Sequence, residues 1–247
     1  MIKHQKNKSM IFKKTMVGVA LGVIGSMASA QAVQGTVSGS FSGAQPAGNA
    51  SYSQNGSKVS FGNDIFNSYC IFDCKSTLEF DSVGRSNGNA ASFAGTVGTA
   101  FELGSFKFYN SVDTAGFLTD LDFRLNLDFA LPTDTPGQSK FIDVKLASTT
   151  NPQADTVSFL NLFGQSYDVG SGYLLTLSAG DFSGRPGVSQ NGNNLDFVIN
   201  EKHHGSAALY GTITAAVPEP GTYALMLAGL GMVASWPSAV ASTEDAR

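Results

Sequence analysis

Leu121-Asp122-Phe123-Arg124-Leu125-Asn126-Leu127-Asp128-Phe129-Ala130-Leu131 alternates apolar and polar residues almost without a break. Successive side chains of a β-strand point to opposite faces, so this period of two puts every leucine and phenylalanine on one face. A helix would spread the same residues around its circumference. The pattern therefore predicts an antiparallel strand with one face on a core and the other in solvent.

Short extended segments continue on both sides of this strand. Residues 141–146 follow a turn at 132–137, so a hairpin with 121–131 is expected. A second hairpin is expected between 165–169 and 173–178, over Gly170-Ser171-Gly172, and Gly104 predicts a bulge in a strand at 101–109. The other predicted strands are 33–41, 58–61, 77–80, 156–159, 195–201 and 208–215.

Glycine, asparagine and serine fill the segments between these strands. Loops are expected at 43–49, 85–91 and 185–194, with a turn at Gly205-Ser206 before the last strand. No window between 31 and 216 shows a helical period. Roughly ten short strands with turn-rich spacing predict an all-β domain, an antiparallel β-sandwich of jelly-roll-like type.

The N-terminal segment has the pattern of a signal peptide. A lysine-rich start precedes a mostly apolar run at 16–27, which predicts a signal helix. Ala28-Ser29-Ala30 and Ala30-Gln31-Ala32 both fit the small-x-small cleavage rule, so cleavage after Ala30 or Ala32 is expected. The expected organisation is a signal peptide at 1–30, a sandwich at 31–216 and a tail at 217–247.

The predicted domain is acidic. Residues 31–216 contain nine lysines and arginines and sixteen aspartates and glutamates, a net charge of −7. Nucleic-acid binding needs basic patches that neutralise phosphates, so this composition argues against a nucleic-acid partner. It is compatible with divalent cations or neutral glycans, and surplus acid also serves solubility.

Cys70 and Cys74 are the two cysteines of the chain, with three residues between them. Because an exported protein meets an oxidising compartment, a local disulfide is expected. Free thiols and a metal site are the alternatives. Zinc takes about four ligands, and the chain offers no second cysteine pair.

The chain changes character at Val217-Pro218-Glu219-Pro220-Gly221. The two prolines cannot continue a strand ladder or lie inside a helix, so the domain is expected to end near Val217. An uncharged run at 223–234 predicts a short apolar helix, shorter than the roughly 20 residues that cross a bilayer. This arrangement resembles the PEP-CTERM sorting tail of Gram-negative bacteria that make extracellular polysaccharide.

The resemblance implies where the protein is sorted and does not imply a biochemical activity. In that family an exosortase of the inner membrane recognises the tail and processes it near the Pro-Glu-Pro, and the protein is released or attached at the surface. The implied partners are the exosortase, the export machinery and, transiently, the inner membrane; the implied location is the cell envelope or extracellular matrix. The family also places a cluster of arginines after the apolar run, whereas here Arg247 is the one basic residue, beside Glu244 and Asp245.

The middle of the chain resembles the choice-of-anchor K domain, a β-rich family of bacterial surface proteins with alternative C-terminal anchors. The likeness implies surface display and carries no catalytic residues. The segments that carry it are 59–62, 76–80, 101–110, 150–157, 173–177, Glu201 and 208–211.

Oxygen-bearing residues near loops are the candidate metal ligands. Asn151, Asp155 and Glu201 could contribute to a calcium site, which takes about six to eight oxygens. No Asp-x-Asp-x-Asp-Gly run occurs, so ordinary turn chemistry is the alternative. His203 and His204 are adjacent, would face opposite sides of a strand, and are expected to be a solvated turn pair rather than a chelate.

No catalytic constellation is visible. Asp122 and Asp128 share a face of the predicted strand but lie six residues apart, about 20 Å, which is too far for one pair of glycosidase carboxylates. They are expected to be solvated charges, as is Asp120. No nucleophile elbow and no phosphate-binding loop is present. The aromatic residues that could stack on a glycan, with core packing as the alternative, are Tyr69, Phe72, Phe108 and Tyr109.

The sequence therefore predicts an exported β-sandwich that is not an enzyme, has no cofactor and plays a structural, adhesive or glycan-binding role, with extracellular polysaccharide as the candidate partner. Two alternatives stay open. One is a polysaccharide-active enzyme whose carboxylates meet across strands, and the other is a calcium-stabilised binding module.

Overall fold

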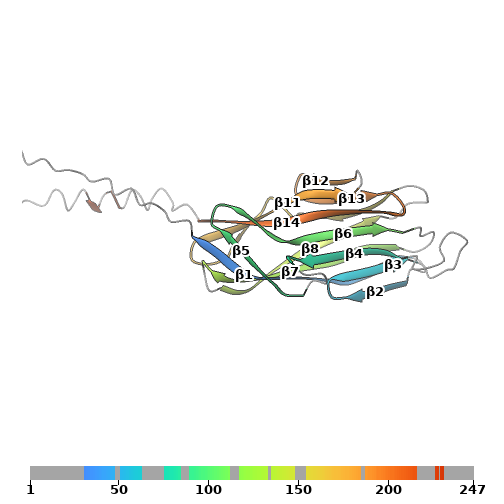
Figure 1. Ribbon diagram of the computed structural model, residues 1–247, viewed down its shortest axis with the longest axis horizontal. Coiled ribbons are helices and arrows are strands. Elements are labelled where there is room, and N and C mark those ends of the chain that lie inside the picture. The colour runs from blue at the N-terminus through green and yellow to red at the C-terminus, as the bar shows by residue number, and fades with distance from the viewer. Residues whose placement is uncertain are drawn as a thin grey trace, which may run out of the picture.

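The computed structural model is an all-β sandwich (Figure 1). It describes residues 31–47, 51–62, 75–84, 89–111, 117–132, 135–147, 154–184, 187–215, 226–227 and 229–230. The predicted signal helix at 1–30 lies outside these residues. Within the tail, 226–227 and 229–230 are helical and the side chains of Met226, Leu227 and Leu230 are exposed.

Two antiparallel sheets of seven strands each face one another. The first sheet has the order β12 (Val188–Asn191), β13 (Asn194–Ile199), β9 (Asp155–Phe159), β8 (Thr135–Ala147), β7 (Phe117–Leu131), β1 (Ala32–Ala47), β5 (Ala91–Thr96). The second has the order β10 (Ser166–Asp168), β11 (Tyr173–Gly184), β14 (His203–Ala215), β6 (Ala100–Asn110), β4 (Ser76–Ser82), β3 (Lys58–Gly62), β2 (Ser51–Asn55). The predicted antiparallel sandwich is confirmed.

The long alternating stretch is β7, and its apolar residues are buried as predicted. From Leu121 to Phe129 the inward residues are at most 3% exposed, whereas Asp122, Arg124 and Asp128 are exposed. The predicted hairpins are also present, since β7 pairs with β8 and β10 pairs with β11. The bulge predicted at Gly104 is seen as a register shift in the pairing of β6 with β14.

The core is built from phenylalanine rings that occupy the space above inward-facing glycines. Phe123 contacts four other rings, those of Phe41, Phe80, Phe106 and Phe159, with centroids 5.0–6.2 Å apart. A Cβ at Gly39 would lie 2.3 Å from Cδ1 of Phe80 and 2.8 Å from Cζ of Phe123. Glycine at this strand position therefore lets β1 approach the aromatic cluster.

Three strands fall where the sequence predicted loops or no structure: β2, β5 and β12. Each forms one edge of a sheet. Edge strands pair on one side, and short polar segments such as Ser51–Asn55 have little intrinsic strand signal. Their strand conformation comes from the neighbour with which they pair, which a local pattern does not record.

Two boundaries also differ from the prediction. Strand β1 continues through the expected loop to Ala47. Register shifts after Ser42 and Gln45 allow the strand to include Gly43 and Pro46. The last turn lies at 200–202, where Lys202 has φ 62 and its N–H donates to the carbonyl of Asn110 at 2.8 Å, rather than at Gly205-Ser206. Gly205 is instead a buried residue of β14, packed under Val188 and Ile199.

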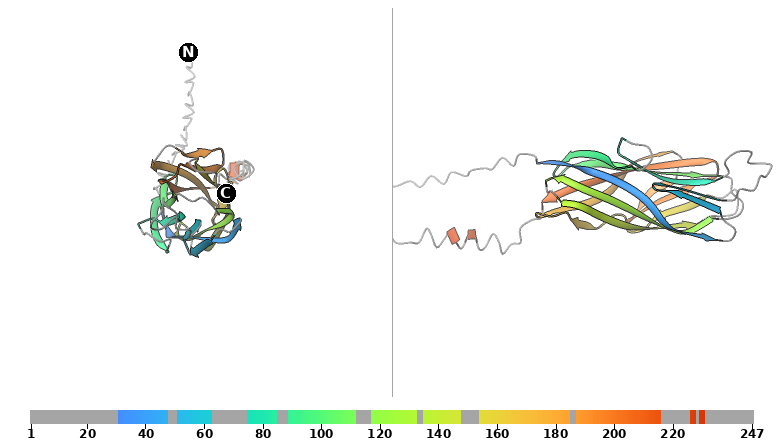
Figure 2. Two further views of the ribbon diagram at one scale, coloured as in Figure 1. Left: turned by 90° about the vertical axis from the view of Figure 1, so that its right-hand side faces the viewer. Right: turned by 90° about the horizontal axis from the view of Figure 1, so that it is seen from below.

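The sandwich has two distinct ends (Figure 2). Strand β1 begins and β14 finishes at the same end, which we call the exit end and define by Gln31, the turn at 97–99, Tyr173 and Ala215. Strand β6 runs from this end to Asn110, which pairs with His203 at the opposite end. We call that opposite end the far end, and define it by Ser76, Asn110, Asp155 and the turn at 200–202.

Candidate functional site

The exit end fastens both terminal segments of the domain to the same few residues. The N–H of Val97 donates to the carbonyl of Gln31 at 2.9 Å, and the next N–H, of Gly98, donates to the carbonyl of Ile213 at 2.7 Å. The Tyr173 hydroxyl bonds the side chain of Gln31, and Tyr173 also pairs with Ala215. The start of β1 and the finish of β14 therefore lie side by side.

The far end contains a buried polar network that joins the two sheets. Asn110 is fully buried on β6, and its Nδ2 donates to the carbonyl of Ile199, on β13 of the other sheet, at 2.7 Å. Its Oδ1 accepts from Oγ of Ser76 at 3.3 Å, and that Oγ accepts from the N–H of Ser111 at 3.0 Å. Buried polar groups need such partners, so this network positions the sheet ends relative to each other.

Two of the three candidate calcium ligands lie at this far end. Asp155 begins β9, is 8% exposed and pairs with Ile199, while Glu201 lies in the turn two residues after Ile199. The third candidate, Asn151, lies outside the described residues. Over the part of the chain that the structure describes, no group of three or more His, Cys, Asp or Glu side chains is arranged to hold a metal ion.

The histidines open β14 and do not form the solvated turn pair that the sequence suggested. His203 pairs with Asn110 and His204 with Tyr109, so the two side chains face opposite sides of the sheet. His204 is exposed, whereas Nδ1 of His203 is buried and has no hydrogen-bond partner among the described residues. The turn falls earlier than expected, which moves both histidines onto the strand.

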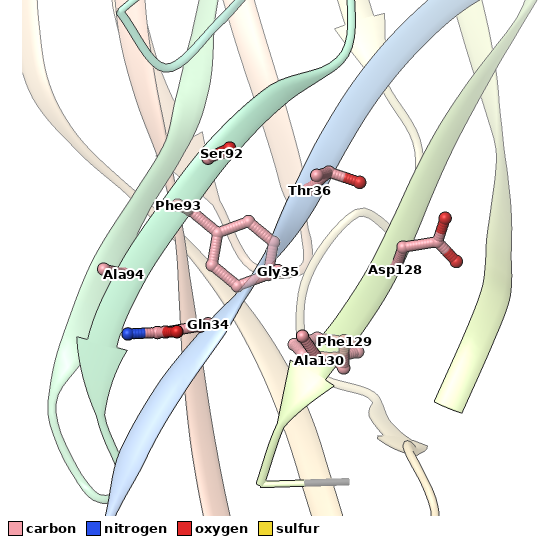
Figure 3. A pocket seen from close by; sticks show the side chains of 9 residues that line it. All are labelled: Gln34, Gly35, Thr36, Ser92, Phe93, Ala94, Asp128, Phe129 and Ala130. Atoms are coloured by element: carbon pink, nitrogen blue, oxygen red, sulfur yellow. The ribbon is translucent and has the colours of Figure 1, made fainter. Parts of the chain in front are cut away.

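An open hollow of about 680 Å³ lies where β1 passes between β5 and β7 (Figure 3). Gly35 lies at its centre, and a Cβ there would be 2.1 Å from the carbonyl oxygen of Asp128 and 2.6 Å from Cζ of Phe93. The rings of Phe93 and Phe129 lie beside this glycine and pack edge to face, with centroids 5.5 Å apart. The space that a side chain of Gly35 would take is thus already filled by Phe93 and by the backbone of β7, and the hollow lies on the outer side of this close approach.

Polar side chains from three strands surround this hollow. Thr36 of β1 pairs with Ser92 of β5 on one side and with Asp128 of β7 on the other, and Gln34 lies two residues along β1. All four side chains are exposed. The sequence pattern predicts a solvated charge at Asp128 and does not indicate the hollow. A glycine at an apolar position of β1 was the available signal, because such a glycine marks close approach of a neighbour.

The other residues considered for chemistry are dispersed. Phe108 is a core residue, 1% exposed and stacked near Phe61, while Tyr109 is 37% exposed on the outer face of the second sheet. Asp120 forms an ion pair with Lys145 across the β7–β8 hairpin. Tyr69 and Phe72 lie outside the described residues, so no aromatic platform is assembled from the four candidates in the part that is described.

One ionisable group on the second sheet is perturbed. Asp181, which has φ 46, lies at the bulge of β11 and accepts a hydrogen bond from the Tyr210 hydroxyl. This bond, followed by burial and by the charges of Asp181 and Glu102, raises the pKa of Tyr210 from 10.0 to about 12. The phenol is therefore held neutral, as a donor, across the physiological range.

Several predicted site residues lie outside the described part of the chain. They are the cleavage-site residues Ala28 and Ala30, the cysteines Cys70 and Cys74, and the motif Val217-Pro218-Glu219-Pro220-Gly221. The cleavage site and the disulfide stay predictions. Of the residues whose structure is described, none belongs to a helix long and apolar enough to span a membrane.

Comparison with known protein families identifies the tail. Residues 216–236 match the PEP-CTERM protein-sorting motif, and this match covers the predicted motif and the whole apolar run. No curated protein matches the chain. The matched tail begins one residue after β14, so it is attached at the exit end. The chain is therefore an exported cell-surface protein of a Gram-negative bacterium, and an exosortase system sorts it through its C-terminal tail.

Proposed function

We propose that this protein is a structural or adhesive, glycan-binding module of the cell envelope or extracellular polysaccharide matrix, and that it is not an enzyme. The observation that carries this proposal is the geometry of the exit end. Gln31 and Ala215 lie beside the same tyrosine, so a membrane-directed tail leaves the domain from one end only. Both faces of the sandwich and the far end then stay accessible to partners.

The resemblance to the choice-of-anchor K domain supports display at the surface. Most of the described residues that carry it fall on the strands β3, β4, β6, β11 and β14, all in the second sheet. The others lie at the start of β9 in the first sheet and at Glu201, in the turn before β14. These are framework strands and contain no shared catalytic group. A family whose members differ in their anchor and share such framework strands is expected to consist of displayed modules rather than of hydrolases.

The chemistry of the hollow also favours binding over hydrolysis. Glycosidases of the common type use two carboxyl groups about 5–10 Å apart, one on each side of the scissile bond. Among the described residues that line the hollow, Asp128 is the single carboxylate. An arrangement with one carboxylate, one amide and two hydroxyls can hold a glycan but lacks the second partner for acid–base catalysis.

The proposal is tested by fractionating the producing bacterium and by a pull-down with its own extracellular polysaccharide. We expect the protein in the outer envelope or matrix fraction and retained by the polysaccharide. A matched variant with Pro218→Ala and Pro220→Ala should accumulate in the inner-membrane fraction, because its domain is unchanged and its motif is lost. The proposal would be contradicted if the wild-type protein showed neither association with the surface nor retention by the polysaccharide.

A calcium-stabilised module is the second candidate, since Asp155 and Glu201 both lie at the far end, on neighbouring positions of β9 and the turn after β13. A ligand that binds the folded state raises the melting temperature by mass action. Thermal melts in calcium and in EDTA test this candidate. A melting temperature that is the same in both would remove it.

A further inference from the structure

We propose that the hollow over Gly35 is a subsite for one pyranose ring of a neutral glycan. This inference rests on the proposed glycan-binding function and assigns it to particular side chains. The site lies on the outer face of the first sheet, where β1 passes between β5 and β7 (Figure 3). Its volume of about 680 Å³ is within the range of ligand sites, roughly 300–1,000 Å³.

The floor of the hollow is fixed by the core. Phe93 packs against Phe129 at 5.5 Å and stacks on Phe101 at 5.1 Å, with an interplanar angle of 10° in the second pair. Because these rings are at most 4% exposed, they cannot swing out to fill the depression. Gly35 cannot be replaced by a larger residue without a clash with the carbonyl of Asp128. The depression is thus a permanent feature of the folded domain.

The rim offers the groups that sugar hydroxyls need. Ser92, Thr36 and Asp128 form one row across three strands, and directly paired residues have Cβ atoms about 4.5–5.5 Å apart. A carboxylate accepts hydrogen bonds from two neighbouring hydroxyls, while the hydroxyls and the amide of Gln34 both donate and accept. These spacings suit the hydroxyls along one edge of a pyranose ring.

The lining also limits the charge of the ligand. Among the described residues that line the hollow, Asp128 is the charged one and it is negative, so a uronate, sulfate or phosphate would meet a like charge there. The remaining wall is made of Ala94 and Ala130, whose methyl groups suit the C–H face of a sugar. Polar edge groups and small apolar walls together select a neutral sugar ring.

The experiment measures binding of the protein, recovered from its host, to the host polysaccharide, to neutral β-glucan, mannan and galactan, and to anionic alginate. Asp128→Asn removes the charge-assisted bonds, and Ala130→Leu fills the hollow without changing charge. We expect each to weaken binding to the retained neutral glycan about tenfold or more. Asp122→Asn, on the same face of β7 and outside the hollow, is the matched control and should bind as wild type does.

The outcomes separate the subsite from the broader function. Retention that is unaffected by Asp128→Asn and Ala130→Leu, in variants with wild-type melting temperatures, would overturn the subsite and leave surface glycan binding standing. Failure to bind the host polysaccharide and all three neutral polymers would overturn both. Tighter binding of alginate than of any neutral polymer would overturn the proposal that the ligand is a neutral glycan. Competition by free glucose, mannose or galactose distinguishes recognition of a single ring from recognition of a longer chain.

Discussion

The exit end and the far end of the sandwich are closed by different kinds of bonds. At the exit end, backbone N–H groups of Val97 and Gly98 fasten the two terminal segments near the surface. At the far end, the fully buried side chain of Asn110 links the sheets. Loss of one hydrogen bond at the exit end should therefore lower the free energy of unfolding only slightly, because water can take the place of the missing partner. At the far end water cannot do so, and the loss of one hydrogen bond leaves a buried polar group without a partner. The end that carries the tail is the one built to tolerate changes in the attached segments.

The largest effect should come from the aromatic cluster that both ends share. Phe123 is fully buried and contacts four rings, so Phe123→Ala should cost about 3–5 kcal/mol of unfolding free energy. Chemical denaturation measures this value and sets the scale for the comparison. A loss below about 1 kcal/mol would mean that the core does not connect the ends as described.

The next effect should distinguish the far end. Asn110→Ala removes the donor to the carbonyl of Ile199 and leaves that group buried without its partner, at a cost of about 1–3 kcal/mol. Thr99→Ala, which removes an exposed hydroxyl that bonds the carbonyl of Thr96 at the exit end, is the matched control. The contrast between the ends fails if both variants lower the unfolding free energy equally.

A smaller effect is expected at the exit end itself. Tyr173→Phe removes only the bond from the hydroxyl to the side chain of Gln31, and an exposed hydrogen bond contributes at most about 1 kcal/mol. The local consequence should be clearer than the global one: amide hydrogen exchange at Val97 and Gly98 should accelerate while that at Asn110 stays unchanged. Equal acceleration at both ends would show that the exit end does not open independently.

The smallest effect concerns the middle of β14. Hydrogen bonding to Asp181 raises the pKa of Tyr210 to about 12, above the value of about 10 in an unfolded chain. The neutral phenol therefore stabilises the fold below pH ~10, and this contribution is lost as the pH rises through about 12. Ultraviolet titration should show one late tyrosine that is absent in Tyr210→Phe and shifted to lower pH in Asp181→Asn; identical titration curves would contradict this assignment.

Much of the framework could be predicted from local pattern. The period of two in β7 fixed its inward face, and Gly170-Ser171-Gly172 and Gly104 marked a hairpin and a bulge correctly. The edge strands β2, β5 and β12 were not predicted, because their conformation depends on pairing with a single neighbour. The tail was predicted because a sorting signal is a linear motif, read without a fold.

The candidate site was less accessible to sequence reasoning. The hollow depends on Gly35, Ser92 and Asp128 from three strands far apart in the chain, and one of those strands was not predicted. Asp155 and Glu201 were proposed as loop residues, but their common location at the far end follows from the pairing of β9 with β13. Register, which sets such meetings, is a property of tertiary pairing rather than of composition.

The most direct test of sorting through the exit end is the intact mass of the protein recovered from its producing bacterium, with the cell fraction recorded. We expect a chain that lacks residues 1–30 or 1–32, terminates near Pro220 and is found outside the inner membrane. The Pro218→Ala and Pro220→Ala variant should keep its tail. A wild-type chain that still terminates at Arg247 and stays in the inner membrane would contradict sorting through this tail.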